Sequence, residues 1–341
     1  MKPLDLEKGR IDLTHGSGGR AMAQLVQEIF VKAFDNEWLR QSNDQASFSV
    51  KEGKMVMATD GHVVSPLFFP GGDIGSLCIH GTLNDVAMSG ARPLYLSASF
   101  IIEEGFLLSD LVKIANSMAQ SARDAGVAIV AGDTKVVEQG KADGVFIATT
   151  GIGMVPEGVA ISGEKAMPGD RIILSGTIGD HGIAVLSKRE NLNFDADILS
   201  DTAALHGLVE KMVEAAPGIH CLRDPTRGGL ATTLNELARQ SGVGMRIVES
   251  RIPVKRAVAA ACELLGIDPL YVASEGKLVA ICQEKDADSL LSVMKSHPLG
   301  QDAAIIGEVV EDRHGFVQME TAFGGMRMVD WLTGEPLPRI C

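Results

Sequence analysis

The first half of the chain mixes hydrophobic patterns of helical and of strand-like spacing. Apolar residues that recur every three or four positions predict helices over residues 75–89 and 109–125, with Ser109 suited to cap the second, and an amphipathic helix after Arg20. Short apolar runs predict strands, two of which flank the turn 51–53 and are expected to form a hairpin. The predicted strands cover residues 47–50, 54–59, 127–131 and 145–155.

The second half repeats this pattern after residues 156–170, a segment rich in proline, glycine and charge that marks a domain boundary. Its predicted strands cover residues 171–175, 245–248, 278–282 and 304–310, and its predicted helices cover residues 203–215, 229–241, 254–265 and 286–296. Two halves that each combine mixed strands with several helices indicate an α/β or α+β fold rather than a helix bundle.

These patterns divide the chain into four parts. Residues 1–42 are expected to form a glycine-rich arm and helix, residues 43–158 the first domain, residues 159–315 a C-terminal α/β domain, and residues 316–341 a tail. The end of the tail, after Trp331, has two prolines and no periodicity, which favours an extended backbone.

Composition narrows the class of protein. The chain has 341 residues, and 45% of them are hydrophobic, which is enough for a substantial core. Its net charge of −13 argues against a nucleic-acid-binding surface, which needs a basic footprint. We expect no signal peptide and no transmembrane helix, and hence a cytoplasmic protein. The five cysteines are widely spaced and lack a C-x-x-C motif, which supports neither a disulfide framework nor a zinc site.

Five short acidic motifs are the strongest chemical feature of the sequence. They are Asn43-Asp44, Thr59-Asp60-Gly61, Asn84-Asp85, Gly132-Asp133-Thr134 and Asp224-Pro225-Thr226-Arg227-Gly228-Gly229. Asp60 and Asp133 follow apolar runs, so we expect them at the ends of strands. Mg²⁺ is held by a few carboxylate oxygens together with substrate phosphates, and several aspartates beside glycine-rich loops suit a metal–nucleotide site. Taken singly, each aspartate is better explained by turn or cap chemistry.

Two glycine-rich segments have the composition to offer backbone N–H groups to phosphates. One is His15-Gly16-Ser17-Gly18-Gly19-Arg20, and the other is Gly228-Gly229, which directly precedes a predicted helix whose dipole favours an anion. Neither is a Walker A loop, because no Gly-Lys-Ser/Thr follows. By itself, the first segment is better explained as a flexible loop.

Cys341 ends the chain on the tail that we expect to be extended. From Thr333 onwards the tail spans up to about 26 Å, enough to enter a pocket or a partner's site, and a frayed end is the alternative. A free thiol has a pKa near 8.5, so a nucleophilic thiolate needs a cation or a base nearby. Lys135 and Glu275 are candidates, although each taken singly is more typical of a surface charge. The other histidines have no metal-ligand spacing and are interpreted as structural, namely His62, His80, His181, His206, His220, His297 and His314.

Together these residues resemble the ATP-binding superfamily of aminoimidazole ribonucleotide synthetase, which includes selenophosphate synthetase and thiamine-monophosphate kinase. The resemblance lies in the acidic motifs and covers essentially the whole chain. Within this group, the 15–20 segment and the terminal Pro338-Arg339-Ile340-Cys341 resemble the HypE family, the carbamoyl dehydratases of NiFe-hydrogenase maturation.

The resemblance implies a two-domain PurM-like fold, in which each domain is a mixed sheet with flanking helices, and a homodimer whose N-terminal halves pair their sheets. It implies that ATP and Mg²⁺ bind between the domains and that residues 43–158 form the ATP-binding and dimerisation domain. The metal ligands carried over to this sequence are Asp44, Asp60, Asp85 and Asp224. The ATP-binding residues carried over are His15, Gly16, Ser17, Gly18, Gly19, Asp60, Asp85, Asp133, Thr134 and Asn235. Lys135 and Glu275 would lie near the inserted tail and form the catalytic set with Cys341.

The same resemblance implies an activity. The carbamoyltransferase HypF would place a carbamoyl group on the Cys341 sulfur, ATP-dependent dehydration would convert it to a thiocyanate, and the cyano group would pass to iron on a HypC–HypD complex. We assign Glu275 as the base and Lys135 as the thiolate or oxyanion stabiliser, and an exchange of these two roles stays open. Two alternatives remain, an ATP-dependent kinase or synthetase that acts on a free small molecule and a carrier that presents Cys341 to other proteins.

Overall fold

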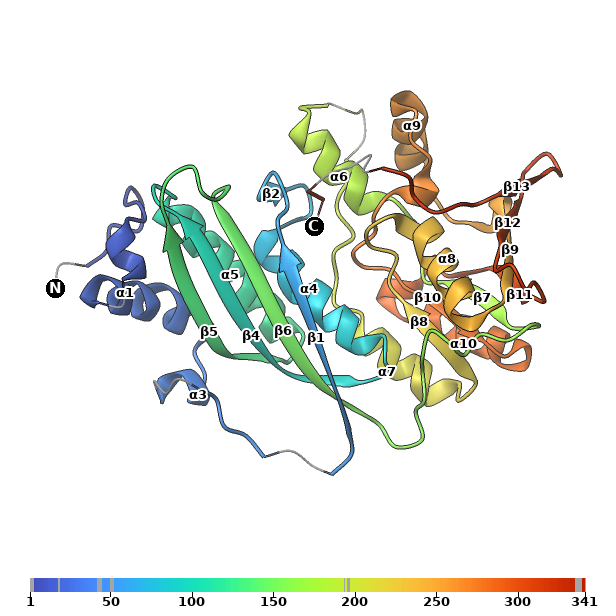
Figure 1. The fold of residues 1–341 in the computed structure, drawn as a ribbon, viewed down its shortest axis with the longest axis horizontal. Coiled ribbons are helices and arrows are strands. Elements are labelled where there is room, and N and C mark those ends of the chain that lie inside the picture. The colour runs from blue at the N-terminus through green and yellow to red at the C-terminus, as the bar shows by residue number, and fades with distance from the viewer. Residues whose placement is uncertain are drawn as a thin grey trace.

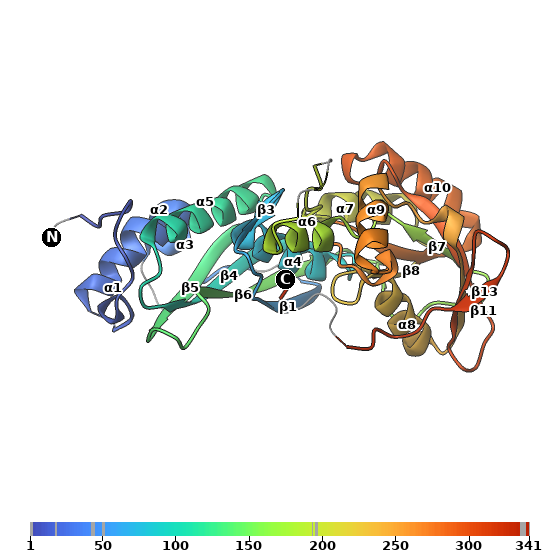
Figure 2. The same cartoon turned by 90° about the horizontal axis from the view of Figure 1, so that it is seen from above.

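The described residues form two large sheets, each with helices packed on it and joined side by side, and a small sheet of β2 and β3 (Figures 1 and 2). The computed structural model describes residues 3–17, 19–41, 45–49, 52–192, 194, 197–334 and 339–340. Three residues with predicted roles, Gly18, Asp44 and Cys341, lie outside this range. The expected α/β architecture with two sheet-containing domains is confirmed.

The N-terminal domain is built on a four-stranded sheet in the order β1-β6-β4-β5. Its strands are β1 (Lys54–His62), β4 (Arg92–Glu103), β5 (Ala128–Val137) and β6 (Val145–Val155). Only β4 and β5 run parallel. Two helices, α4 (Ile74–Ala87) and α5 (Leu108–Asp124), cover one face (Figure 2). Alternate side chains of β4 and β6 are buried under these helices, as expected for a sheet with one covered face.

The N-terminal arm packs on the far edge of this sheet. A 3₁₀ turn, η1 (Leu13–Gly16), precedes a continuous helical stretch of α1 (Arg20–Leu25), the π-helical turn η2 (Val26–Val31) and α2 (Lys32–Phe34). A short helix, α3 (Glu37–Arg40), follows. The predicted amphipathic helix is confirmed, because its buried residue Phe30 packs against Phe100 of β4 with ring centroids 4.5 Å apart.

Within the described residues, the second face of the N-terminal sheet is covered only near Tyr95 of β4, which Trp38 of α3 and Phe48 contact, and is otherwise uncovered (Figures 1 and 2). The exposed apolar side chains Met55 and Met57 of β1 and Ile101 of β4 lie on this face, and Met57 is 74% exposed. We call it the open face. A single folded chain rarely leaves such an apolar sheet surface in water.

The C-terminal domain is built on a seven-stranded sheet in the order β13-β12-β9-β11-β7-β10-β8. Its strands are β7 (Arg171–Leu174), β8 (Ile219–Arg223), β9 (Gly244–Val248), β10 (Val279–Cys282), β11 (Ala304–Val310), β12 (Val317–Glu320) and β13 (Met326–Met328). Helices α7 (His206–Ala215) and α10 (Glu284–Ser296) cover one face, and α8 (Gly229–Ser241) covers the other. Both faces are buried, which explains why β7 and β10 are continuous apolar runs rather than alternating ones.

Two further helices connect the domains. Side chains of α6 (Asp180–Arg189) and α9 (Arg256–Leu265) join the apolar core of the N-terminal domain. The remaining short elements are β2 (Phe68–Phe69), β3 (Gly72–Asp73), η3 (Glu249–Arg251), η4 (Pro269–Tyr271) and η5 (Pro298–Gly300). Within the part of the chain that the structure describes, no helix has the length and apolar character needed to cross a membrane.

Several predictions about local structure were wrong. The hairpin over residues 47–59 does not form, because β1 pairs with β6 and residues 47–49 form no strand, while Val50 and Lys51 lie outside the described residues. Helix α5 is preceded by Leu107, which makes no side-chain cap, so Ser109 is not the cap. The predicted tail from residue 316 contains β12 and β13, so the segment without secondary structure starts at Val329.

Candidate functional site

Four acidic side chains from distant parts of the sequence converge between the two domains. Asp60 comes from β1, Asp85 from α4, Asp224 from the end of β8, and Glu275 from the loop before β10. Asp60 lies on the covered face of its sheet, the face that meets α4. The four carboxylates are close enough that each of the other three raises the pKa of Glu275. We call them the carboxylate cluster.

Burial and mutual repulsion disfavour ionisation in most of this cluster. Desolvation, followed by repulsion from Asp224 and Asp60, raises the pKa of Asp85 to about 7. Desolvation also raises the pKa of Asp224 to about 6, with a contribution from Asp60. A bound cation would relieve this repulsion, which is the electrostatic character expected of a metal–phosphate site.

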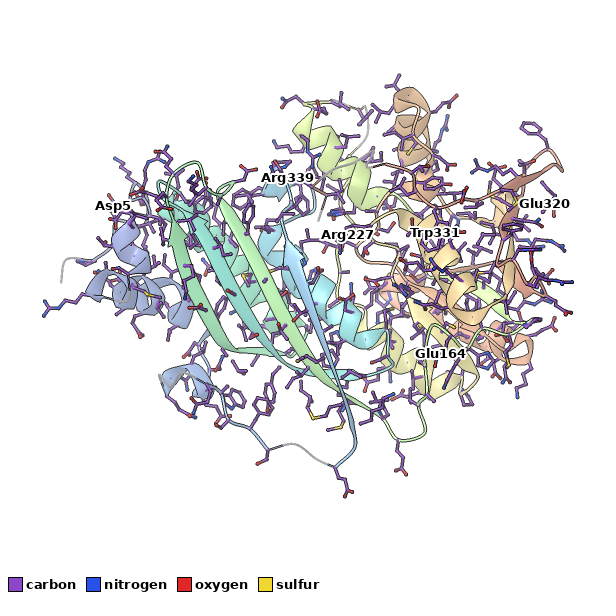
Figure 3. All side chains as sticks on the ribbon, viewed as in Figure 1. Asp5, Glu164, Arg227, Glu320, Trp331 and Arg339 are labelled. Atoms are coloured by element: carbon purple, nitrogen blue, oxygen red, sulfur yellow. The ribbon has the colours of Figure 1, made fainter. Side chains whose placement is uncertain are left out.

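Asp60 is the exception in the cluster. Desolvation opposes its ionisation, but the imidazole of His62 at 3.3 Å, the Gly61 amide and Arg227 together hold the pKa of Asp60 below its usual range. Arg227 lies between the two domains in Figure 3. Asp60 is therefore the member that carries a negative charge most readily.

Glu275 is the most deeply buried member, with 3% of its surface exposed. Its Oε1 atom has no hydrogen-bond partner, and burial raises the pKa of Glu275 well above that of an ordinary glutamate. Its backbone is fixed at both ends, since its N–H donates to Asp201 Oδ1 (3.1 Å) and its carbonyl accepts from Asn84 Nδ2 (3.1 Å). An unpartnered buried carboxyl oxygen held this rigidly is suited to receive a proton from a bound group.

Asn84 holds the two domains together at this point, and Asp201 fixes the loop of the C-terminal domain that bears Glu275. Asn84, on α4, also donates to the Ala203 carbonyl (3.0 Å), and its side-chain oxygen accepts from the Leu205 amide (2.8 Å). Asp201 forms an ion pair with Lys277 at 3.1 Å. The sequence motif Asn84-Asp85 thus has two separate uses, with the asparagine fixing the domain interface and the aspartate facing the cluster.

The predicted metal ligands form an open set rather than a closed cage. Among the described residues, no three His, Cys, Asp or Glu side chains are grouped closely enough to hold a metal ion by themselves. Asp44 lies outside those residues. Mg²⁺ typically uses one or two carboxylates and completes its shell with water and phosphate, so an open set with coupled carboxylates suits Mg²⁺ carried in with a nucleotide.

In the glycine-rich segment, the described residues His15, Gly16 and Gly19 each have a defined structural role. His15 is buried, and its Nδ1 accepts from the Asp12 amide at 3.1 Å, which closes a capping box around η1. The segment packs against β5, because a side chain at Gly16 would lie 2.7 Å from Val136. Gly19 caps α1. These contacts place the described residues of the segment against β5, and its interpretation as a flexible loop stays a prediction.

Asp133 and Lys135 lie on the open face of β5, where they form an ion pair of 2.5 Å. Thr134 points to the opposite face and is buried beneath the N-terminal helix. Asp133 lies within β5 and Asp60 lies within β1, so the expectation that both sit at strand ends was wrong. The strand pairing of β1 continues to His62 and that of β5 to Val137, beyond the two aspartates. The short apolar runs before the aspartates do not predict this extension.

Lys135 does not meet Glu275 within one chain. Strands β5 and β1 form opposite edges of the sheet, about 14 Å apart at the usual strand spacing. Lys135 also lies on the face opposite to that of Asp60. The side-chain amide of Asn235, a predicted nucleotide ligand, donates to the Ala231 and Val329 carbonyls (2.8 and 2.9 Å) and so anchors the start of the tail.

The last described residues of the chain dock against α6 and the segment before β2. The side chain of Ile340 is buried in the core of the N-terminal domain, and its carbonyl accepts from His181 Nε2 at 2.8 Å. The Arg339 carbonyl accepts from the Ser65 amide (3.1 Å) and from Arg189 (2.7 Å). Figure 3 places Arg339 beside α6. Cys341 follows directly but lies outside the described residues.

Sequence reasoning missed His62 and His181, which it interpreted as structural. His62 holds Asp60 in its charged form, and His181 holds the tail. Their partners lie far away in sequence or depend on strand register, so spacing gave no signal for His181. The signal for His62 was available, because residues two apart on a strand lie on the same face.

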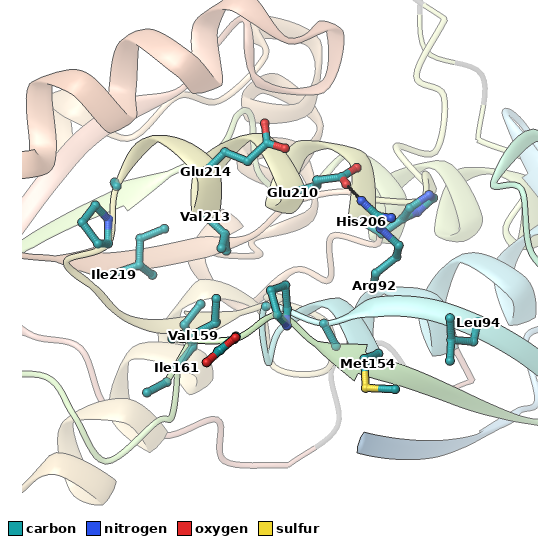
Figure 4. Close-up of a pocket in the computed structure, with 18 of the residues that line it drawn as sticks. Arg92, Leu94, Met154, Val159, Ile161, His206, Glu210, Val213, Glu214 and Ile219 are labelled. Carbon is teal, nitrogen blue, oxygen red and sulfur yellow. Dashed lines mark hydrogen bonds and ion pairs between the residues drawn. The ribbon is translucent and has the colours of Figure 1, made fainter. Parts of the chain in front are cut away.

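A separate cavity of about 840 Å³ lies where α7 meets the start of β4 and the end of β6 (Figure 4). Apolar side chains such as Leu94, Met154 and Ile161 line it, together with the ion pair of Arg92 and Glu210 and with His206. The residues that line it include no member of the carboxylate cluster and neither Arg339 nor Ile340. This cavity is therefore not the candidate site.

Comparison with known proteins gives the family. Models described as the N-terminal and C-terminal domains of AIR synthase related protein match residues 42–155 and 167–320. The carbamoyl dehydratase HypE of Cupriavidus necator is 69% identical over 100% of this chain and 97% of its own length. The chain belongs to the HypE family. The predicted resemblance and the PurM-like fold are thereby confirmed.

Solved structures of the HypE family agree with this fold. A crystal structure of hydrogenase maturation protein HypE in complex with ATP has a TM-score of 0.94 and 50% identity, covering 96% of this chain and 99% of that chain. HypE in a crystal structure of a HypE–HypF complex has a TM-score of 0.80 and 52% identity, covering 90% of this chain and 99% of that chain. Those two solved HypE proteins are thus seen with ATP and with HypF, respectively.

Proposed function

We propose that this protein dehydrates a carbamoyl group carried on the sulfur of its own Cys341, using ATP, and thereby forms a thiocyanate. The observation that supports the proposal is the docking of the tail on α6, which is hydrogen-bonded to the loop that bears Glu275. Ile340 is bound by His181, and the residue after His181, Gly182, donates its N–H to the Ala273 carbonyl at 3.1 Å. Two residues further along is Glu275. The end of the chain and the unpartnered carboxyl thus share one rigid frame.

The proposed reaction proceeds in two steps. The carbamoyl oxygen attacks the γ-phosphorus of ATP, which releases ADP and leaves the carbamoyl carbon bonded to a phosphorylated oxygen. The carbon–oxygen bond then breaks, phosphate departs, and the protons leave the nitrogen, so that a carbon–nitrogen triple bond forms on sulfur. Phosphorylation is needed because hydroxide is a poor leaving group. Attachment of the substrate to the tail supplies the effective concentration.

The chain's own residues divide the work in this proposal. Asp60, Asp85 and Asp224, together with Asp44, would hold Mg²⁺, which neutralises charge on the phosphates when bound. Glu275 would accept a nitrogen proton, because its raised pKa makes its ionised form a stronger base than an ordinary glutamate. His15, Gly16, Ser17, Gly18, Gly19, Asp133, Thr134 and Asn235 keep their predicted nucleotide roles as part of the proposal.

We also propose that two copies pair through the open face. The face bears the apolar side chains of Met55, Met57 and Ile101, and the charges of Asp133 and Lys135 lie at its β5 edge. Pairing of the sheets would cover the apolar surface and bring Lys135 to the interface. The role of Lys135 as thiolate or oxyanion stabiliser is therefore proposed for the dimer.

Replacing Met57 with aspartate is expected to produce a monomer at micromolar concentration. The charge would be buried within the proposed interface, where an unpaired carboxylate is strongly disfavoured. Sedimentation velocity measures the change. Leu264→Asp, at an exposed apolar residue of α9, is the matched control and should leave the mass unchanged. A dimeric Met57→Asp variant, or a wild-type monomer, would contradict pairing through the open face.

The proposed partners follow from the reaction. HypF would supply the carbamoyl group, and a HypC–HypD complex would receive the cyano group on iron. Transfer to another protein requires that the tail leave its docked position, so the contacts of Arg339 and Ile340 must be reversible.

Intact-mass measurement tests the function directly. The full chain is first incubated with the carbamoyl-donor system and then with ATP and Mg²⁺. We expect the mass of the C-terminal peptide to rise by a carbamoyl group and then to fall by one water. Incubation without ATP is the control and should preserve the carbamoyl mass. A carbamoyl mass that persists in the presence of ATP would rule out dehydration.

A further inference from the structure

We propose that His181 is the positioning residue that sets the docked register of the tail, through a hydrogen-bond relay that runs from Thr202 to the Ile340 carbonyl. Only the expected effect on the dehydration rate rests on the proposed function. It assigns a role to a histidine that contacts neither the carboxylate cluster nor any predicted nucleotide ligand in the hydrogen bonds of the described residues.

The direction of each hydrogen bond in the relay is determined by chemistry. A carbonyl oxygen only accepts, so His181 Nε2 must carry the proton donated to Ile340 at 2.8 Å. In a neutral imidazole Nδ1 is then an acceptor, and the Ser200 hydroxyl donates to it at 2.8 Å. The Ser200 oxygen in turn accepts from the Thr202 amide at 3.1 Å. Complete burial lowers the pKa of His181, which favours the neutral ring that this chain requires.

The ring has little freedom to move. His181 is fully buried, and its ring meets that of Phe69 edge-on with centroids 5.4 Å apart. Loss of the Ile340 contact would leave Nε2–H buried without an acceptor, which is costly, so the tail is selected in the register that places this carbonyl there. A second contact, from Arg189 to the Arg339 carbonyl at 2.7 Å, fixes the preceding peptide.

His181 and Arg189 both donate to backbone carbonyls of the tail. These hydrogen bonds therefore fix the path of the backbone and do not recognise a side chain. The Ile340 carbonyl carbon is bonded to the nitrogen of Cys341, and holding it therefore holds the peptide plane from which the reacting residue starts. Ser200 and Thr202 of the relay flank Asp201, which accepts a hydrogen bond from the Glu275 amide. The tail and Glu275 are therefore held by the same short segment. A displacement of one carbonyl would thus change the position of the tail relative to Glu275.

The test compares His181→Ala and His181→Gln in the full chain. The first removes the donor, and the second restores an N–H donor to the carbonyl. One measurement is the rate of Cys341 alkylation by N-ethylmaleimide, quantified on the C-terminal peptide. The other is hydrogen exchange over residues 330–341. Both are made with and without a non-hydrolysable ATP analogue, and neither depends on dehydration, so they separate this inference from the proposed function.

Of the two conditions, with and without the ATP analogue, one should protect the wild-type tail from alkylation. In that condition we expect His181→Ala to increase the rate of Cys341 alkylation about tenfold. His181→Gln should recover most of the protection, and Ser200→Ala should give an intermediate rate. The Kd for the ATP analogue should stay unchanged in all three, while the dehydration rate falls in parallel with protection. His314→Ala, at an exposed histidine, is the control and should match the wild type.

Three results would overturn the inference. The first is an equal rate of Cys341 alkylation in the wild type and in folded His181→Ala. The second is a lack of rescue by His181→Gln together with normal protection in Ser200→Ala. The third is a wild-type tail that is unprotected both with and without the ATP analogue. Thermal unfolding of each variant establishes that it is folded. If His181→Ala does not fold, Ser200→Ala alone decides, because it removes one hydrogen bond of the relay and leaves the ring in place.

Discussion

Cys341→Ser is expected to show no detectable formation of the thiocyanate. We expect its rate to fall by more than about a thousandfold relative to the wild type, as is typical of enzymes that lose their nucleophile. A thiolate is accessible near neutral pH, whereas a serine hydroxyl needs a dedicated base to act as a nucleophile, so the carrier function ends with the sulfur. The measurement is mass spectrometry of the C-terminal peptide after incubation with the carbamoyl donor and ATP.

The control for this prediction is Cys262→Ala, which removes a buried free cysteine of α9 and should preserve product formation. Deletion of residues 337–341 is a second test. An enzyme that acts on a free small molecule would keep its activity without these residues, whereas a self-modifying enzyme would lose it. Thiocyanate-bearing product at the normal rate from Cys341→Ser would disprove the self-modifying mechanism.

Glu275→Gln is expected to slow dehydration by about 10²- to 10⁴-fold, the usual contribution of a general base. The substitution keeps the size of the side chain and its backbone contacts with Asp201 and Asn84, but it removes the site that accepts the proton. Carbamoylation of Cys341 should continue, so the carbamoylated peptide accumulates. Single-turnover mass spectrometry after addition of ATP measures the rate.

The pH dependence gives a further test of this role. Because burial and the neighbouring carboxylates raise the pKa of Glu275, its ionised fraction grows as pH rises through a range higher than that of an ordinary glutamate. The wild-type rate should therefore rise with pH over that range, and Glu275→Gln should lose this rising limb. Glu263→Gln, on the exposed side of α9, should keep both the rate and the limb. A Glu275→Gln variant with the wild-type rate and profile would exclude this residue as the base.

Secondary structure was predictable where it depends on local spacing. Helix α8 and strands β6 and β11 begin and end where their patterns predict, because each has a continuous periodic run between clear breaks. Strand β4 was missed, since its outer positions Ser97 and Ser99 interrupt the apolar run and resemble a loop. The hairpin was predicted wrongly because a turn indicates that the chain reverses but not which strand becomes the partner.

The sequence by itself determined the acidic motifs and the terminal Pro-Arg-Ile-Cys, and hence the family, because these are properties of residue type and order. Only the tertiary structure decided which of those residues meet. It gathered Asp60, Asp85, Asp224 and Glu275, separated Lys135 from them on the opposite face of the sheet, and gave His181 a partner 159 residues away. The physical reason is that burial and strand register bring distant residues together, and a change of one position in register exchanges the two faces of a sheet.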